Sequence, residues 1–219
     1  MKKYLILLML IRTLDAFAQG FVNLDFENAN LSGYGPGLVP ASDAIPGWTA
    51  SLGGVTQANI YYDVAPSALG IYIYDNSDLQ GNYSVLIQGT SNEPASIGQT
   101  ATIPTSTQYL IWWGFLDPDG LTFNGQPLSF SNVGNGPHYD IFEASISAFA
   151  GQTAELLFTS RGLPAAGGGS IDNIQFSSSA VPEPPILDWL GLGTLLFVRR
   201  SHKGGPHQRH FDRIVRSIS

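Results

Sequence analysis

Between residues 19 and 177, hydrophobic and polar positions alternate over short runs that are separated by turn residues. In the stretch GIYIYD, Ile71 and Ile73 fall on one face of an extended chain, while Tyr72 and Tyr74 fall on the other. This period of two is typical of β-strands. No stretch of the region has the longer period of an extended amphipathic helix.

Nine such runs are rich in Ile, Val, Tyr, Phe and Thr, and they cover residues 58–65, 70–76, 82–89, 95–104, 108–116, 121–130, 139–147, 153–160 and 169–177. Short runs at this spacing, without helical intervals, predict an all-β fold, an antiparallel β-sandwich. Asn124 and Gly125 form the strongest hairpin signal, because both central positions of a type I′ turn need a positive φ. We expect this hairpin to join residues 121–123 to residues 128–130.

The 219-residue chain has a net charge of −7, but its charges are unevenly placed. From Gln19 to Ala180 a single arginine, Arg161, stands against thirteen carboxylates, so this region carries a net charge of −12. From Arg199 onward, six basic residues and one carboxylate give +5. The acidic body excludes nucleic acid as a partner, because nucleic-acid binding needs clustered Lys and Arg. The absence of cysteine excludes disulfides and thiolate chemistry.

The N-terminus has the pattern of a secretory signal peptide. Lys2 and Lys3 precede an apolar run from Tyr4 to Ile11, and the small residues of Ala16–Ala18 follow it. This order predicts export, with cleavage before Gln19. A short core helix is the alternative interpretation.

A second apolar segment, Ile186–Val198, lies near the C-terminus, between prolines and a pair of arginines. As a helix it would be about 20 Å long, whereas the hydrocarbon core of a bilayer is about 30 Å thick. The segment therefore predicts a marginal transmembrane helix. Arg199 and Arg200 would stay on the cytoplasmic side, which places the acidic body outside.

Residues 181–200, VPEPPILDWLGLGTLLFVRR, resemble a PEP-CTERM sorting tail. The motif consists of Val181, Pro182, Glu183, Pro184 and the basic pair Arg199 and Arg200. The resemblance implies cleavage by an exosortase, a membrane-embedded enzyme of Gram-negative bacteria that make exopolysaccharide. The implied product is an exported, inner-membrane-anchored precursor that is then delivered to the cell surface or the extracellular matrix. Tails of this family usually stop soon after the arginines, whereas this chain continues to Ser219.

Four parts follow from these patterns. They are a signal peptide, residues 1–18; a β-sandwich body, residues 19–178; a sorting and anchor segment, residues 179–200; and a basic cytoplasmic tail, residues 201–219.

Both edges of the body resemble galactose-binding-like jelly rolls. FVNLDFENANL followed by IPGWTA is similar to the opening strand, and SIDNIQFS is similar to the closing strand. The resemblance implies two sheets with adjacent ends, and often a structural calcium ion that ties the first strand to the last. Glu27 and Asp172 match the acidic positions of that calcium site, and calcium prefers such oxygen ligands. The alternative interpretation is that both are ordinary surface carboxylates or turn caps.

Aromatic residues provide candidates for contact with exopolysaccharide, because a sugar ring stacks on an aromatic face. The candidates are Trp48, Trp112 and Trp113, together with Tyr61 and Tyr62. Trp112 and Trp113 are adjacent, so on a strand one of them must face the core. Packing alone is the alternative role for each ring, since a β protein buries many aromatic residues.

Catalytic motifs are absent from the sequence. His138 is the sole histidine of the body, and neither a Gly-x-Ser-x-Gly elbow nor a His-Glu-x-x-His zinc motif is present. We therefore expect a non-catalytic exported protein that is polysaccharide-associated or structural. A glycan-active hydrolase that uses two carboxylates and a simple membrane-anchored surface protein are the alternatives.

Overall fold

The computed structural model describes residues 20–75, 79–115, 120–161 and 169–182. Strands dominate these residues, in agreement with the predicted all-β class. In chain order the elements are β1 (Gly37–Pro40), α1 (Ala41–Ala44), β2 (Thr49–Leu52), β3 (Val55–Thr56), β4 (Asn59–Tyr62), β5 (Gly70–Asp75), β6 (Tyr83–Gln88), β7 (Ala95–Thr102), β8 (Tyr109–Phe115), β9 (Gly120–Phe123), β10 (Gln126–Pro127), β11 (Phe130–Asn135), β12 (Asp140–Ser145), the 3₁₀ helix η1 (Ser147–Phe149), β13 (Thr153–Ser160) and β14 (Gly169–Ser177).

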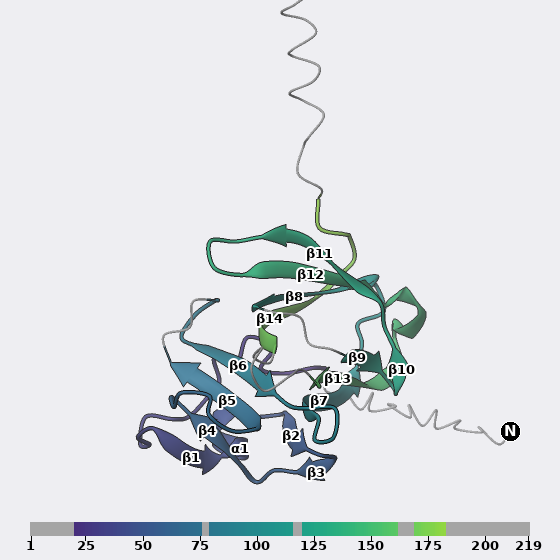
Figure 1. Ribbon diagram of the computed structural model, residues 1–219. Coiled ribbons are helices and arrows are strands. Elements are labelled where there is room, and N and C mark those ends of the chain that lie inside the picture. The colour runs from purple at the N-terminus through teal and green to yellow at the C-terminus, as the bar shows by residue number, and fades with distance from the viewer. Residues whose placement is uncertain (1–19, 76–78, 116–119, 162–168, 183–219) are drawn as a thin grey trace, which may run out of the picture. The chain divides into compact units, whose positions relative to one another are not determined.

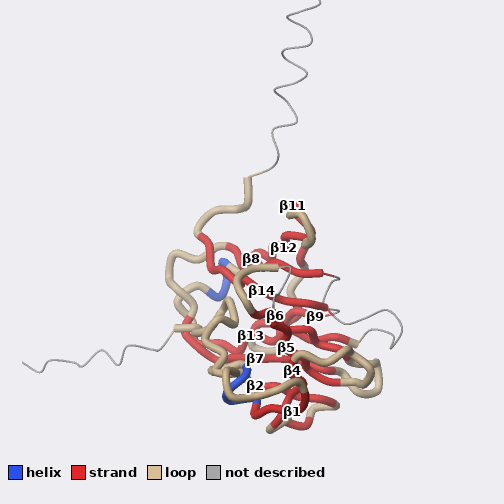
Figure 2. Tube along the Cα trace, turned by 90° about the vertical axis from the view of Figure 1, so that its left-hand side faces the viewer, coloured by secondary structure: helices blue, strands red, loops and turns tan. Residues whose placement is uncertain are grey.

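The strands form two sheets (Figure 1). The larger has the order β1-β4-β5-β6-β14-β8-β12-β11, and the smaller has the order β10-β9-β13-β7-β2-β3. Figure 2 shows the larger sheet running from β11 at the top of the view to β1 at the bottom. Among the described strands, neighbours pair antiparallel except β4 and β5, which pair in parallel through Tyr61 and Tyr72. The prediction of antiparallel pairing is wrong at this one position.

Each of the nine predicted runs contains a strand, but four further strands, β1, β2, β3 and β11, were not predicted. Three of the four are edge strands, and together they contain a single buried residue, Val39. The fourth, β2, is a four-residue strand beside the two-residue edge strand β3. Their sequences therefore lack the alternation that revealed the other strands.

Hydrophobic side chains from both sheets form one core. Ile71 and Ile73 of β5 face this core with at most 1% of their surface exposed, as the alternation predicts. Leu156 and Phe158 of β13 approach it from the smaller sheet and are fully buried. At about 25 cal/mol per Å² of apolar surface, burial of side chains such as these is the main stabilising contribution to the fold.

The predicted hairpin at Asn124 and Gly125 is confirmed, since both residues have positive φ, 48° and 73°. The second strand differs from the expectation. It begins directly after the turn as Gln126–Pro127, and Phe130 starts β11 in the larger sheet. The chain thus crosses from one sheet to the other after Leu128, whose N–H still donates to the carbonyl of Leu121.

The segment that resembles an opening strand, residues 21–31, forms turns instead. Asn23 and Phe26 have positive φ, 51° and 56°, which breaks an extended conformation. The turns direct Phe26 and Leu31 into the core, where at most 2% of each side chain is exposed. This segment therefore closes one end of the core without joining a sheet.

Strand β14 lies inside the larger sheet, between β6 and β8. Its pairing with β8 shifts register between Asp172 and Gln175, and Asn173 within this interval has a φ of 45°. Such a bulge bends the strand and re-aims a side chain. Here the strand leaves β6, and the Ile174 N–H donates to the carbonyl of Leu24 in the N-terminal segment.

Contacts within the chain delimit a unit that ends at Pro182. Among the described residues, no helix has the length and apolar character needed to cross a membrane. The predicted signal peptide, residues 1–18, and the predicted transmembrane helix, Ile186–Val198, lie outside the described residues.

Candidate functional site

Glu27 joins the N-terminal segment to the loop between β5 and β6. Its Oε1 accepts hydrogen bonds from the backbone N–H groups of Asn82 (2.6 Å) and Tyr83 (2.9 Å), and its Oε2 accepts one from Asn82 Nδ2 (2.9 Å). Gly81 allows this close approach, because a Cβ at that position would fall on the Glu27 carboxylate. Three hydrogen bonds to one carboxylate fix the two segments against each other.

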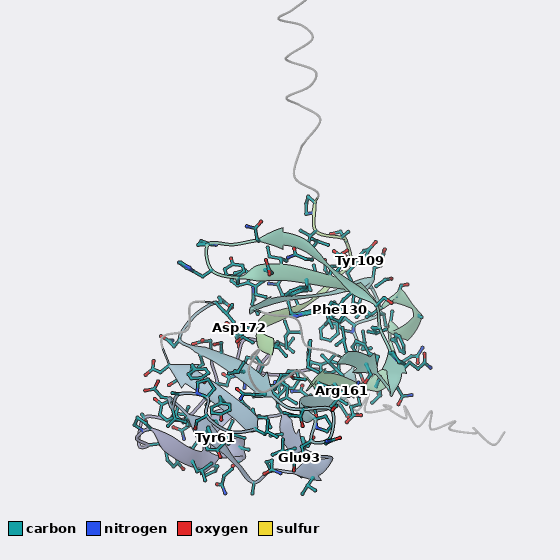
Figure 3. The ribbon with its side chains drawn as sticks, in the orientation of Figure 1. Tyr61, Glu93, Tyr109, Phe130, Arg161 and Asp172 are labelled. Atoms are coloured by element: carbon teal, nitrogen blue, oxygen red, sulfur yellow. The ribbon has the colours of Figure 1, made fainter. Side chains whose placement is uncertain are left out.

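Asp172 lies on β14 and is completely buried. Its Oδ2 accepts the N–H of Gln80 (2.9 Å), and its Oδ1 accepts the N–H of Asn173 (2.6 Å). Figure 3 labels Asp172 in the middle of the larger sheet, between Tyr61 on one side and Tyr109 on the other. Asp172 and Glu27 therefore hold the same short loop, residues 80–83, from two different segments of the chain.

The charge of Asp172 is unfavourable where it lies. Burial raises the pKa of this carboxyl, the hydrogen bonds from Asn173 and Gln80 lower it, and the negative charges of Glu27 and Asp25 raise it, so that the pKa is about 8. A bound cation would favour the ionised form and remove this penalty. The structure brings Glu27 and Asp172 to the same loop, and the two carboxylates interact electrostatically, while the calcium site stays a prediction.

The donor set of this cluster fits a hard cation such as calcium, which prefers carboxylate and amide oxygens. Gln80, whose backbone N–H binds Asp172, has a buried Oε1 that accepts no hydrogen bond within the described part of the chain. Across the described ranges, no group of three or more His, Cys, Asp or Glu side chains is arranged to hold a metal ion. A calcium ion at Glu27 and Asp172 would therefore need amide oxygens, backbone carbonyls or water as its other ligands.

Two of the three candidate tryptophans are core residues. Trp48 is 6% exposed and donates its indole N–H to the carbonyl of Asn23 (2.9 Å). Trp112 is fully buried and stacks on Phe142 with ring centroids 5.5 Å apart. The assignment of Trp48 and Trp112 as ligand-binding residues is therefore corrected, because neither presents a ring face to solvent.

Trp113 faces away from the core, as its alternation with Trp112 requires, and is half-buried. It stacks on Tyr139 with centroids 4.3 Å apart and ring planes 10° from parallel. Trp113 also pairs directly with Asp172 across β8 and β14. Directly opposed residues of antiparallel strands share a face, so the aromatic pair and the buried carboxylate lie on the same outer face of the larger sheet.

The tyrosines are arranged differently. Tyr62 is buried in the core. Tyr61 stacks on Tyr72 at 4.7 Å, and Tyr72 is nearly parallel to Tyr74 at 6.2 Å. Tyr72 is 1% exposed and its hydroxyl donates to the carbonyl of Ala68, so the central ring of the ladder is packed, whereas Tyr61 and Tyr74 are half-buried.

Of the sorting-motif residues, Val181 and Pro182 are described by the structure, whereas Glu183, Pro184, Arg199 and Arg200 lie outside the described residues. The Val181 N–H donates to Oε2 of Glu143 on β12 (2.7 Å). Sequence reasoning missed Glu143, Gln80 and Tyr139. Each lies in a stretch of the sequence without a motif, and only the strand pairing and loop geometry bring it to its partner.

Comparisons with known proteins add little to this geometry. No protein-family model matches the sequence, and no curated protein matches it significantly. A solved structure of the bacteriophage CBA120 tailspike protein 4 enzymatically active domain is similar with a TM-score of 0.35 and 15% sequence identity. The similarity covers 60% of this chain and 19% of the tailspike chain, and at this TM-score it supports no conclusion about function.

Proposed function

We propose that this protein is a non-catalytic, exported β-sandwich of the galactose-binding-like jelly-roll type. A PEP-CTERM tail sorts it to the cell surface or matrix, where it contacts exopolysaccharide. The sequence pattern of residues 1–18 and 181–200 supports the export and sorting. The contact with polysaccharide is supported by one observation, the half-buried Trp113 stacked on Tyr139 on the outer face of the larger sheet.

Among the three candidate tryptophans, Trp113 is the one that is not buried in the core. Stacking on Tyr139 holds the Trp113 ring in one orientation, so little side-chain entropy remains to be lost when a ligand binds. The apolar face of a pyranose packs on such a ring, and its hydroxyls need polar partners nearby. The acidic body favours a neutral or amine-bearing polysaccharide, because a polyanion would be repelled by the thirteen carboxylates.

Calcium has a structural role in this proposal. Held by Glu27 and Asp172, the ion would supply positive charge to two carboxylates that both bind the loop of residues 80–83. It would thereby fasten the N-terminal segment to β14, next to Trp113. The ion takes no part in any reaction.

Affinity electrophoresis of the body, Gln19 to Pro182, in gels containing neutral, amine-bearing or acidic polysaccharides tests the contact. We expect retention by a neutral or amine-bearing polysaccharide and about fivefold weaker binding by Trp113→Ala, since an aromatic contact contributes about 1 kcal/mol. Tyr34→Ala is the matched control, because Tyr34 is an exposed aromatic residue that bonds Asp43 outside this face. Equal retention of Trp113→Ala and the wild-type protein would refute the assignment of Trp113.

Two further measurements test the other parts of the proposal. Release of reducing ends from the same polysaccharides, abolished by a carboxylate-to-amide substitution, would show that the protein is a hydrolase. The mass of the mature C-terminus in the native host reports sorting, since cleavage removes residues from the tail. An intact C-terminus at Ser219 in cells that contain an exosortase would contradict the proposed processing.

A further inference from the structure

The chain remains attached to the body after its last strand ends. Strand β14 ends at Ser177, whose carbonyl accepts the N–H of Gln108 (2.8 Å). Beyond it, the Ser177 hydroxyl donates to the carbonyl of Ser179 (2.6 Å) and accepts the Ser179 N–H (3.2 Å). These bonds form a compact turn that directs the following residues back along the sheet.

Residues 178–182 follow β14, and we call them the strap. Glu143 holds the end of the strap. It lies on β12, paired with Ile111 of β8, and its Oε2 accepts the Val181 N–H at 2.7 Å. Both Glu143 and Val181 are half-buried. A short bond from a backbone N–H to a partly buried carboxylate is stronger than a bond between neutral groups.

The bond engages the first residue of the predicted sorting motif. In Val-Pro-Glu-Pro, residues 181–184, neither proline has an N–H, so Val181 and Glu183 carry the two backbone donors of the motif. One of these two donors is occupied by Glu143. Pro182 also biases Val181 toward an extended conformation, which limits the ways in which the strap can rearrange.

We propose that Glu143 is a positioning residue that clamps the sorting motif to the folded body, so that a processing enzyme must release Val181 before it can bind the motif's backbone. The inference rests on the proposed function for its processing partner, a membrane-embedded enzyme that reads an extended Pro-Glu-Pro segment. The clamp itself rests on the geometry of β12 and the strap. Removing the acceptor frees the Val181 N–H and makes the motif available sooner.

The test compares full-length wild-type protein with Glu143→Ala, Glu143→Gln and the control Glu155→Gln. Glu155 is an exposed carboxylate on β13, in the other sheet. Hydrogen exchange on the full chain in detergent reports the clamp, because only Val181 and Glu183 contribute amide hydrogens within residues 181–184. A pulse-chase experiment in exosortase-containing cells reports the rate at which the tail is removed.

We expect Val181 to exchange about tenfold faster in Glu143→Ala, with a smaller increase in Glu143→Gln, whose amide oxygen can still accept a hydrogen bond. Tail removal should accelerate in the same order, with Glu155→Gln equal to the wild type. Unchanged exchange at Val181 would overturn the clamp. Faster exchange with an unchanged rate of processing would overturn its positioning role.

Failure of the proposed function gives a different result. If the wild-type protein and all variants keep their tails, the sorting proposal fails and the processing role of Glu143 fails with it. The exchange measurement still decides whether Glu143 holds Val181.

Discussion

Replacing Asp172 by asparagine tests the electrostatic account of the buried cluster. The pKa of Asp172 is about 8 in the folded protein, against an ordinary value of 3.8. Between pH 3.8 and about pH 8, Asp172 keeps its proton in the folded protein and releases it in the unfolded chain. The contribution of this group to stability is therefore fully present below about pH 4 and is lost as the pH rises to about 8.

The size of the effect follows from the same two values. Each pH unit between the two pKa values lowers the free energy of unfolding by about 1.4 kcal/mol, so the full loss is at most about 5–6 kcal/mol. That is a large part of the 5–15 kcal/mol that typically stabilises a domain of this kind. Asparagine keeps the neutral charge of the protonated acid and one acceptor oxygen, but its NH₂ group cannot accept the second of the N–H bonds from Gln80 and Asn173, a cost that does not change with pH.

The assay is urea unfolding of the body, Gln19 to Pro182, at several pH values from 5 to 8 in the presence of a chelator. We expect the stability of the wild-type protein, measured relative to Asp172→Asn, to fall steadily over this range, so that the variant is the more stable protein at pH 8. Calcium, bound as proposed, should reverse the order at pH 8, because the ion would bind the ionised carboxylate of the wild-type protein more tightly than the neutral amide of the variant. A stability difference between the two proteins that stays constant from pH 5 to 8 without calcium would refute the reasoning.

Two other substitutions test the segments around the cluster. Gly81 has a φ of +64°, and a Cβ at this position would meet the Glu27 carboxylate. Gly81→Ala should therefore lower the free energy of unfolding by about 1–2 kcal/mol, measured by thermal unfolding, and weaken calcium binding, measured by calorimetry. Gly125→Ala, at φ +73° with open space around it, is the matched control and should leave calcium binding unchanged. Gln99→Ala removes both of the hydrogen bonds that Gln99 makes with the backbone of Val22. The free energy of unfolding should fall by about 2–3 kcal/mol, and the amide hydrogen of Val22 should exchange faster. Unchanged exchange at Val22 would contradict the tethering role of Gln99.

The fold was predictable wherever one face of a strand is buried. Ile71 and Ile73, or Leu156 and Phe158, leave a period of two in the sequence because each pair faces the same core. Strand β11 leaves no such pattern. It is an edge strand with a bulge at Asn132 and Gly134, so half of its side chains meet solvent.

The candidate site was predictable only in part. Resemblance placed Glu27 and Asp172 together, and alternation separated Trp112 from Trp113. The sequence contains no local signal for the loop of residues 80–83, because its contribution comes from backbone N–H groups, which every residue except proline carries. The stacking of Tyr139 on Trp113 likewise depends on the pairing of β12 with β8, a long-range property of the sheet.

The position of β14 between β6 and β8 also determines at which stage of folding the core can be completed. Without the last strand, the larger sheet would consist of two separate halves, and the N-terminal segment would lack the partner that Ile174 provides. The core therefore cannot be completed before β14, which ends at Ser177, has taken its place. A chain dominated by such distant pairings folds slowly, and under the export that we propose its folding would wait until this last strand had left the translocation channel.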